Sequence, residues 1–352
     1  MNKSNYLIWF RRLALGGAAL AFVVIVLGAW VRLSAAGLGC PDWPGCYGHL
    51  SAEDAARNVD AINAAFPERP FEYHKAVKEM VHRYFASTLG FVILVLAGLA
   101  IANRDAPEQP LALPIALVGL VIFQGLLGMW TVTLLLKPLI VVLHLLGGLA
   151  TFSLLAWLAM KPGETRDSRL GTRDSTQPAR FEPQPPASRL QSLRNLAAAG
   201  LCILILQIGL GGWTSSNYAA LACPDFPTCQ NAWWPEMDAA DAFVLWRGLG
   251  IDYEGGVLDH PARVAIHFAH RLGAIAAALI LGALSIAAWR ARELPGVRMR
   301  GALLAIVLLA QLVLGPLMVM RALPLPLATA HNGVAVLLLL ATVRLNRVLR
   351  WS

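Results

Sequence analysis

Charged residues are scarce in this chain of 352 residues. Asp, Glu, Lys and Arg make up 14% of it, whereas hydrophobic residues make up 57% and the mean hydropathy is +0.59. Soluble globular domains carry about 25% charged residues, so this composition excludes a soluble globular protein. No basic patch is interleaved with aromatic residues, and the net charge of +8 therefore does not indicate nucleic-acid binding.

Two further features are missing. The first apolar stretch has no small-residue cleavage site and is too long for the core of a signal peptide, which favours a retained membrane helix. No Gly or Pro interruption recurs at mid-membrane in both parts of the chain, which argues against a secondary transporter with broken helices.

Long apolar stretches fill most of the chain. Eight of them reach roughly 20 residues, the length that spans about 30 Å of hydrocarbon. We expect membrane helices near residues 12–34, 77–101, 111–135, 138–160, 194–216, 262–289, 299–321 and 325–346.

Basic residues predict the orientation of these helices. Most loop Lys and Arg residues lie at the two termini and in the segments near 102–110, 161–194 and 290–300. Because translocation disfavours Lys and Arg, we expect these segments and both termini on the cytoplasmic side. The loops near 35–75 and 217–261 then lie on the outer face.

The chain contains an internal repeat. Cys40-Pro-Asp-Trp-Pro-Gly-Cys46 recurs 183 residues later as Cys223-Pro-Asp-Phe-Pro-Thr-Cys229, and Gly28-Ala-Trp30 matches Gly211-Gly-Trp213 at the same offset. The pair His82-Arg83 recurs as His270-Arg271, and His144 as His331. A repeat of this kind determines the architecture.

The repeat predicts an all-α membrane protein with two four-helix bundles. We expect an N-terminal half over residues 1–160, a polar cytoplasmic linker over 161–193 and a C-terminal half over 194–352. Since four helices return the chain to the same side, the halves are parallel repeats, related by a pseudo-twofold axis along the membrane normal. Stretches 50–66 and 236–250 are mildly amphipathic and predict short helices on the outer surface.

Four histidines lie near the outer ends of the even-numbered predicted helices, at similar depth: His82, His144, His270 and His331. A single intramembrane histidine more often makes an interhelical hydrogen bond. Two pairs in matching register favour ligation instead, because two imidazoles on facing helices can hold a haem iron from opposite sides.

One position differs between the halves close to these histidines. Glu79 precedes His82 by three residues and shares its helix face, whereas His267 occupies the equivalent position before His270. Glu79 is predicted either to form an ion pair with Arg83 at i+4 or to act on a proton beside a bound porphyrin. Arg83 and Arg271 are candidate partners for porphyrin propionates.

Each long outer loop carries a cysteine pair, Cys40 with Cys46 and Cys223 with Cys229. On the outer face these pairs can form static disulfides, which the sequence favours, or redox-active ones. A zinc site built from all four is disfavoured by the spacing of five residues. Cys202 lies inside a predicted membrane helix and is expected to be inert.

Together these residues resemble the haem A synthase family, over nearly the whole chain. The resemblance is carried by Glu79-Met-Val-His-Arg83, His144, His267-Phe-Ala-His-Arg271, His331-Asn-Gly333 and both cysteine pairs. The family implies oxidation of the C8 methyl group of haem O, a farnesylated porphyrin, to the formyl group of haem A for cytochrome oxidase.

The resemblance also implies roles for the two halves. His270 and His331 would ligate a haem b cofactor, with Arg271 and His267 close by. His82, His144 and Arg83 would bind haem O, with Glu79 as the catalytic residue in two successive hydroxylations and loss of water. Cys40 and Cys46 would handle haem or electrons. The long first outer loop and the long linker depart from the family pattern.

Implied partners are haem O, haem O synthase and cytochrome oxidase assembly factors, in a bacterial inner membrane; homo-oligomerisation stays open. The sequence leaves two alternatives, a dihaem membrane cytochrome b and a haem transporter or chaperone. A carrier would not need Glu79 in one half and His267 in the other. Extraction of the bound haems separates these functions.

Overall fold

The computed structural model describes residues 3–106, 109–160 and 187–351. Within these ranges all regular structure is helical apart from isolated bridges in the two cysteine loops. Eight of the helices are long and apolar enough to cross a membrane, which confirms the predicted count and defines a multi-pass membrane protein.

The first four membrane helices are α1 (Lys3–Leu33), α4 (Tyr73–Ala102), α5 (Ala112–Thr133) and α6 (Pro138–Ala159). The last four are α7 (Ala187–Ser216), α9 (His260–Trp289), α10 (Pro295–Met320) and α11 (Leu325–Trp351). Proline begins α6 and α10 and is the second residue of α9, positions where its missing N–H needs no partner.

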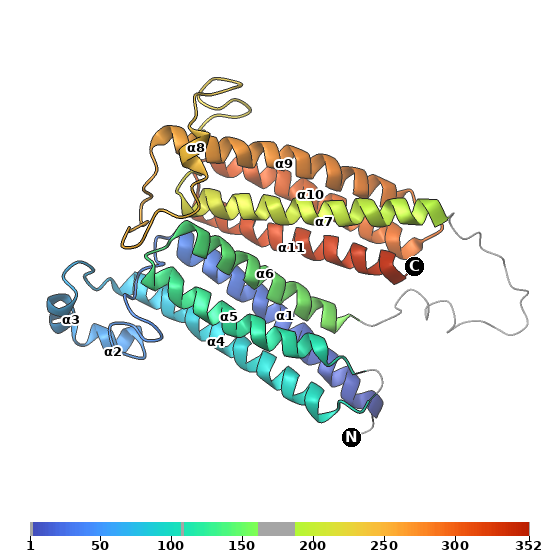
Figure 1. Ribbon diagram of the computed structural model, residues 1–352, viewed down its shortest axis with the longest axis horizontal. Coiled ribbons are helices and arrows are strands. Elements are labelled where there is room, and N and C mark those ends of the chain that lie inside the picture. Colours follow the sequence, from blue (N-terminus) through green and yellow to red (C-terminus); the bar gives the residue numbers. More distant parts are fainter. Residues whose placement is uncertain (1–2, 107–108, 161–186, 352) are drawn as a thin grey trace, which may run out of the picture.

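Helix contacts follow the order of the chain. In the first set α1 packs on α4 and α6, and α5 packs on the same two helices. In the second set α7 packs on α9 and α11, and α10 does likewise. The sets meet chiefly through α1 against α11 and α6 against α7, with α6 also touching α11, and they lie side by side in Figure 1.

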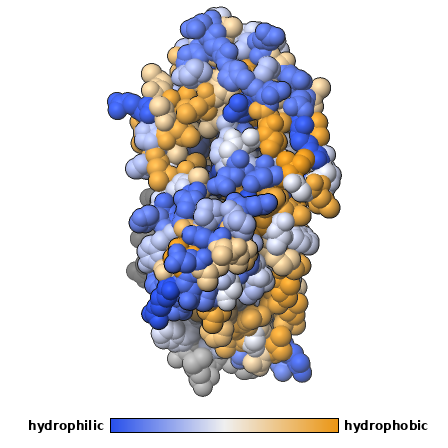
Figure 2. All heavy atoms as spheres, turned by 90° about the vertical axis from the view of Figure 1, so that its left-hand side faces the viewer, coloured by the Kyte–Doolittle hydropathy of each residue, from blue (hydrophilic) through white to orange (hydrophobic). Residues whose placement is uncertain are grey.

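Short helices lie at one end of the molecule, which we call the loop end. Both termini lie at the opposite end (Figure 1). The predicted helices of the first loop are present as α2 (Ala52–Ala56) and α3 (Val59–Ala65), and the Ser51 hydroxyl caps α2 by accepting the N–H of Asp54. In the second loop only α8 (Ala239–Ala242) forms. Figure 2 shows the loop end covered largely by hydrophilic residues, with hydrophobic ones toward its sides.

The linker expected over 161–193 falls mostly on residues outside the described ranges. Residues 187–193 are instead the first two turns of α7. This segment is polar, but the backbone stays helical beyond the apolar stretch, and the candidate membrane span begins at Ser188.

The main apolar core occupies the half of the bundle toward the termini. It includes Phe10, Leu155, Leu281 and Leu345, all fully buried. Four of the contributing helices carry one of the histidines His82, His144, His270 and His331, and the other four carry a glycine that lies against one of these rings. On every contributing helix the core residues lie closer to the end with the chain termini than that histidine or glycine does. The loop-end half is therefore left for the polar side chains that the sequence singled out.

Candidate functional site

The four histidines lie on four different helices, His82 on α4, His144 on α6, His270 on α9 and His331 on α11. The helices that carry each pair pack on the same two neighbours, α1 and α5 for His82 and His144, and α7 and α10 for His270 and His331. The structure thus places one of the two predicted pairs in each set of helices.

Each imidazole lies against a glycine of a neighbouring helix. A Cβ atom added at Gly28 would lie 2.9 Å from Cε1 of His82, and one at Gly211 would lie 3.1 Å from Cε1 of His270. The corresponding distances are 3.4 Å for Gly128 and His144 and 3.5 Å for Gly315 and His331. Gly28 and Gly211 are therefore required for the rings to approach the neighbouring backbone.

Glutamines hold three of these histidines in place. Gln124 Nε2 donates to the carbonyl oxygen of His144 at 2.9 Å, and Gln207 Nε2 donates to that of His270 at 3.0 Å. Gln207 also lies 3.0 Å from His270 Nδ1, and Gln311 Nε2 lies 3.2 Å from His331 Nε2. Gln207 was missed in the sequence, although a lone polar residue inside an apolar helix was a visible signal.

The donor set fits haem iron. Buried Nδ1 atoms of His82, His144 and His331 have no hydrogen-bond partner, and a buried polar atom in that state requires an explanation. Among the described residues no group of three or more His, Cys, Asp and Glu side chains could hold a metal ion. Paired imidazoles suit an iron whose other four ligands come from a porphyrin.

Glu79 is buried and connects α4 to the first cysteine loop. Its Oε2 accepts the backbone N–H of Cys40 at 2.9 Å, and its Oε1 accepts Arg83 Nη2 at 2.5 Å. The predicted i,i+4 ion pair is confirmed. Arg83 Nη1 donates to the carbonyl oxygens of Asp42, Pro44 and Gly45.

His267 makes the equivalent contacts in the second half. Its Nδ1 accepts the backbone N–H of Cys223 at 3.3 Å, and its side chain is also buried. Arg271 donates to the carbonyl oxygens of Thr228, Cys223 and Asp225 at 2.7–2.8 Å. Glu79 and His267 therefore perform the same structural task, and both arginines bind loop carbonyls; their role toward propionates stays a prediction.

Both cysteine pairs form disulfides, Cys40–Cys46 and Cys223–Cys229. This excludes the four-cysteine zinc site. Within each loop an aspartate binds backbone N–H groups, Asp42 those of Tyr47 and Gly48 and Asp225 those of Gln230 and Asn231. The hydroxyl of Thr228 and these N–H groups lower the pKa of Asp225 to about 2.

A loop of the second half lies over the first half. This crossing loop, residues 243–258, donates the N–H of Tyr253 to the carbonyl oxygen of Leu135 at 3.0 Å. Tyr253 is buried in a cluster with Leu38, Val132 and Leu136. The buried Lys137 amine donates to the carbonyl oxygen of Gly248, and burial lowers its pKa.

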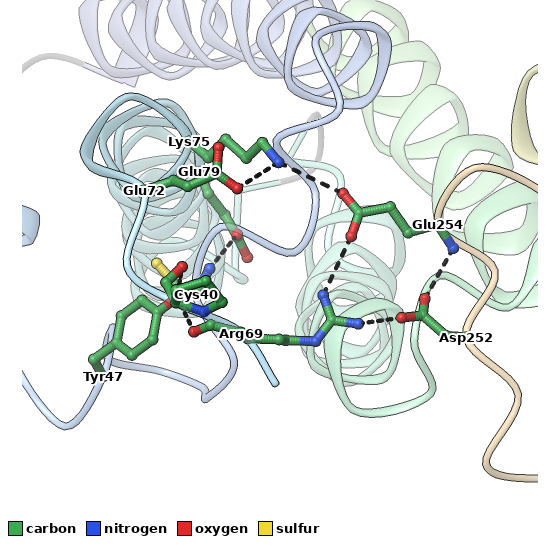
Figure 3. A network of polar contacts seen from close by, with 9 residues as sticks. Cys40, Tyr47, Arg69, Glu72, Lys75, Glu79, Asp252 and Glu254 are labelled. Atoms are coloured by element: carbon green, nitrogen blue, oxygen red, sulfur yellow. Dashed lines mark hydrogen bonds and ion pairs between the residues drawn. The ribbon is translucent and has the colours of Figure 1, made fainter. Parts of the chain in front are cut away.

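Ion pairs extend this contact toward Glu79 (Figure 3). Arg69 reaches Asp252 at 2.6 Å and Glu254 at 3.3 Å. The carbonyl oxygen of Arg69 accepts the hydroxyl of Tyr47 at 3.1 Å. Tyr47 packs with Cys40 and Cys46 in one buried cluster, so residues of the second half support the loop that holds Glu79.

The fold and the site define a class: a multi-pass membrane protein whose two paired sets of intramembrane histidines suit haem iron. Over residues 11–343 the chain matches the COX15-CtaA model, described as cytochrome oxidase assembly protein, and it belongs to that family.

Relatives match over nearly the whole chain. The heme A synthase of Shewanella oneidensis is 42% identical over 340 residues, which cover 97% of this chain and 96% of the relative. The heme A synthase of Caulobacter vibrioides is 29% identical, and the match covers 95% of this chain and 94% of that relative. The heme A synthase of Rhizorhabdus wittichii is 27% identical, and the match covers 92% of this chain and 89% of that relative.

Proposed function

We propose that this protein is a haem A synthase, an oxidoreductase that converts the C8 methyl group of haem O to the formyl group of haem A for cytochrome oxidase. The observation that carries the proposal is the placement of two histidines in each set of four helices, in a chain that is 42% identical to a heme A synthase over 97% of its length. A haem bound to this protein supplies the oxidising chemistry, since side chains alone do not oxidise an unactivated methyl group.

The two halves take different haems in this proposal. His270 and His331 ligate a haem b cofactor in the C-terminal half. His82 and His144 bind haem O in the N-terminal half, close to Glu79 at the base of the first cysteine loop. Gln207 and Gln311 each lie within hydrogen-bond distance of an imidazole nitrogen, of His270 and His331 respectively, and so limit the rotation of these rings.

Glu79 is the proposed proton-handling residue. Its carboxylate already binds Arg83 and the N–H of Cys40, so it is held in one place at the loop end of the site. At its Oε atoms it would accept or deliver a proton, or position a water molecule, during the two hydroxylations of the methyl group. Arg83 keeps this carboxylate oriented.

We further propose that the two helix sets are related by a pseudo-twofold axis along the membrane normal, since they repeat the same order of helix contacts. The termini lie in the cytoplasm of a bacterial cell and the disulfide loops on the outer face of its inner membrane, as the basic residues predict. Haem O synthase and cytochrome oxidase assembly factors are the proposed partners.

The structure changes the argument against a dihaem carrier. Because Glu79 and His267 both accept the N–H of the first cysteine in their loops, their difference alone does not separate an enzyme from a carrier. The identity to heme A synthases favours the enzyme.

Expression with a source of haem O, followed by chromatography of the extracted haems, tests the proposal. A synthase yields haem A or its hydroxymethyl precursor, and His270→Ala abolishes that product. A chain that returns only two equivalents of haem b is a carrier, and one that returns only unaltered haem O is a transporter.

A further inference from the structure

The two sets of helices meet chiefly along two seams, and one of them is grooved. A groove of about 530 Å³, open to the surface of the molecule, lies between α1 and α11, and we call it the α1–α11 cavity. Phe22, Val26 and Trp30 line it from α1, and Thr329, Gly333 and Leu337 are among the residues that line it from α11. Its lining is almost wholly apolar.

The seam between α6 and α7 is filled instead. The repeat places Trp213 where the first seam has Trp30, Val142 where it has Thr329, and Leu146 where it has Gly333. Trp213 and Val142 are buried in one cluster, with Leu146 packed against it, and Trp213 Nε1 donates to the carbonyl oxygen of Ala242. The missing side chain at Gly333, where the filled seam has Leu146, therefore accounts for the cavity in the first seam.

The cavity lies at the depth of both histidine pairs. Val26 and Trp30 lie two residues either side of Gly28 and therefore on the opposite face of α1 from the ring of His82, which packs against Gly28. Thr329, Ala330 and Gly333 flank His331 on α11, although none of the four histidines lines the cavity. Helix α1 therefore forms a wall of the first histidine site and a wall of this cavity.

Two axial imidazoles leave one degree of freedom undetermined. They fix the plane of a porphyrin but not its rotation about the axis that joins the two nitrogens. A site that oxidises one methyl group among several must fix that rotation. In a membrane the hydrocarbon chain of the substrate gains little from leaving lipid, so a shaped cavity for it serves orientation more than affinity.

We propose that the α1–α11 cavity binds the farnesyl chain of haem O and thereby sets which porphyrin edge faces Glu79. The inference rests on the function proposed above. The cavity is apolar and lies within membrane-spanning segments, and it shares a helix with the substrate site, which together suit a branched hydrocarbon chain attached to that substrate. Haem b, which has no such chain, does not use the cavity.

Filling the cavity tests the proposal. Gly333→Leu restores the residue found in the filled seam, and a Cβ atom at Gly333 would meet Val26 at 3.6 Å, an ordinary contact. Gly333→Ala is the matched control, because it adds only that Cβ atom. Val26→Phe fills the same space from α1 and provides a second variant should Gly333→Leu fail to fold.

The measurements are titrations of purified protein with haem O and with haem B, and mass spectrometry of the product. We expect Gly333→Leu and Val26→Phe to bind haem O at least tenfold more weakly, to bind haem B as the wild type does, and to lose oxidation at C8. Gly333→Ala should lose less haem O affinity than Gly333→Leu, because it adds only one carbon atom. The haem spectrum of the C-terminal half reports folding.

Unchanged preference for haem O over haem B in the filled variants overturns the proposal, and so does an equal loss of both ligands. A phospholipid or quinone that copurifies with wild type but not with Gly333→Leu, with haem O binding unchanged, identifies a different occupant. The titrations measure binding and do not require turnover. If the wild-type protein makes no haem A, the proposed function is contradicted, but the titrations still test whether the cavity binds the farnesyl chain.

Discussion

A methyl group added at Gly28 should weaken haem binding in the first half. The new Cβ atom would lie 2.9 Å from Cε1 of His82, about 0.5 Å closer than the 3.4 Å at which ordinary contact begins. The ring or helix α1 must move by about that distance, and ligand-binding geometry tolerates no more than about 0.5 Å. Overpacking of this kind costs about 1–3 kcal/mol, or roughly 5- to 150-fold in the dissociation constant.

The chain supplies its own controls. Gly211→Ala should have a smaller effect on the second pair, because its Cβ atom would lie 3.1 Å from His270. Gly128→Ala and Gly315→Ala meet His144 and His331 at 3.4 and 3.5 Å, so they should bind haem normally. All four glycines lie inside helices and gain similar helix propensity on substitution, which leaves the contact as the difference.

The assay is the haem content and absorption spectrum of each purified variant, with haem titration for those that lose it. Equal haem affinity in Gly28→Ala and Gly128→Ala would refute the reasoning, because it would show that the imidazole positions do not depend on these contacts. A loss confined to Gly315→Ala would refute it equally.

Three further outcomes are expected. Glu79→Gln keeps an oxygen for the N–H of Cys40 but removes the charge, so haem O binding should persist while conversion to haem A falls at least tenfold; conversion at the native rate contradicts the proton role. Arg69→Ala removes its two ion pairs to the crossing loop, worth together about 1 kcal/mol, and leaves that of Lys75 with Glu254. Chymotrypsin should then cut the loop about fivefold faster, whereas the exposed Arg57→Ala should not change the rate. The pKa of Asp225 is lowered, so its carboxylate stabilises the second disulfide loop above about pH 4, and this contribution is lost as the pH falls toward about 2. Reduction of the Cys223–Cys229 disulfide by a phosphine should therefore become faster as the pH falls through this range. The Asp225→Asn variant should show no such step.

The sequence predicted the membrane helices well because hydropathy measures what the bilayer requires. It placed their ends less well. The helices α4, α7 and α10 begin at Tyr73, Ala187 and Pro295, several residues before the apolar stretches do. Polar residues outside the hydrocarbon region extend these helices without adding to the apolar signal.

The histidine pairs were predictable because the repeat fixes their depth and the number of helices fixes their direction. The contacts of Gly28 and Gly211 with the rings were not, since they depend on the rotation of one helix against its neighbour. Gln207 was hidden by the repeat itself, because the equivalent residue in the first half is Val24. The difference between Glu79 and His267 was visible, but their shared contact with a cysteine N–H was not.

The crossing loop was beyond sequence reasoning for a related reason. Its partners Arg69, Leu135 and Lys137 lie more than 100 residues away in the chain, so no local pattern marks these contacts. A pattern that repeats predicts only what both copies share.

That loop also sets an order on biosynthesis. The ribosome makes α1 to α6 long before residues 243–258 emerge, so the first four membrane helices are complete before the segment that contacts their loop end. The proposed haem O site of the first half therefore forms before that contact can be made. Loading of a bulky porphyrin into the first half has an interval during synthesis in which nothing from the second half stands in its way.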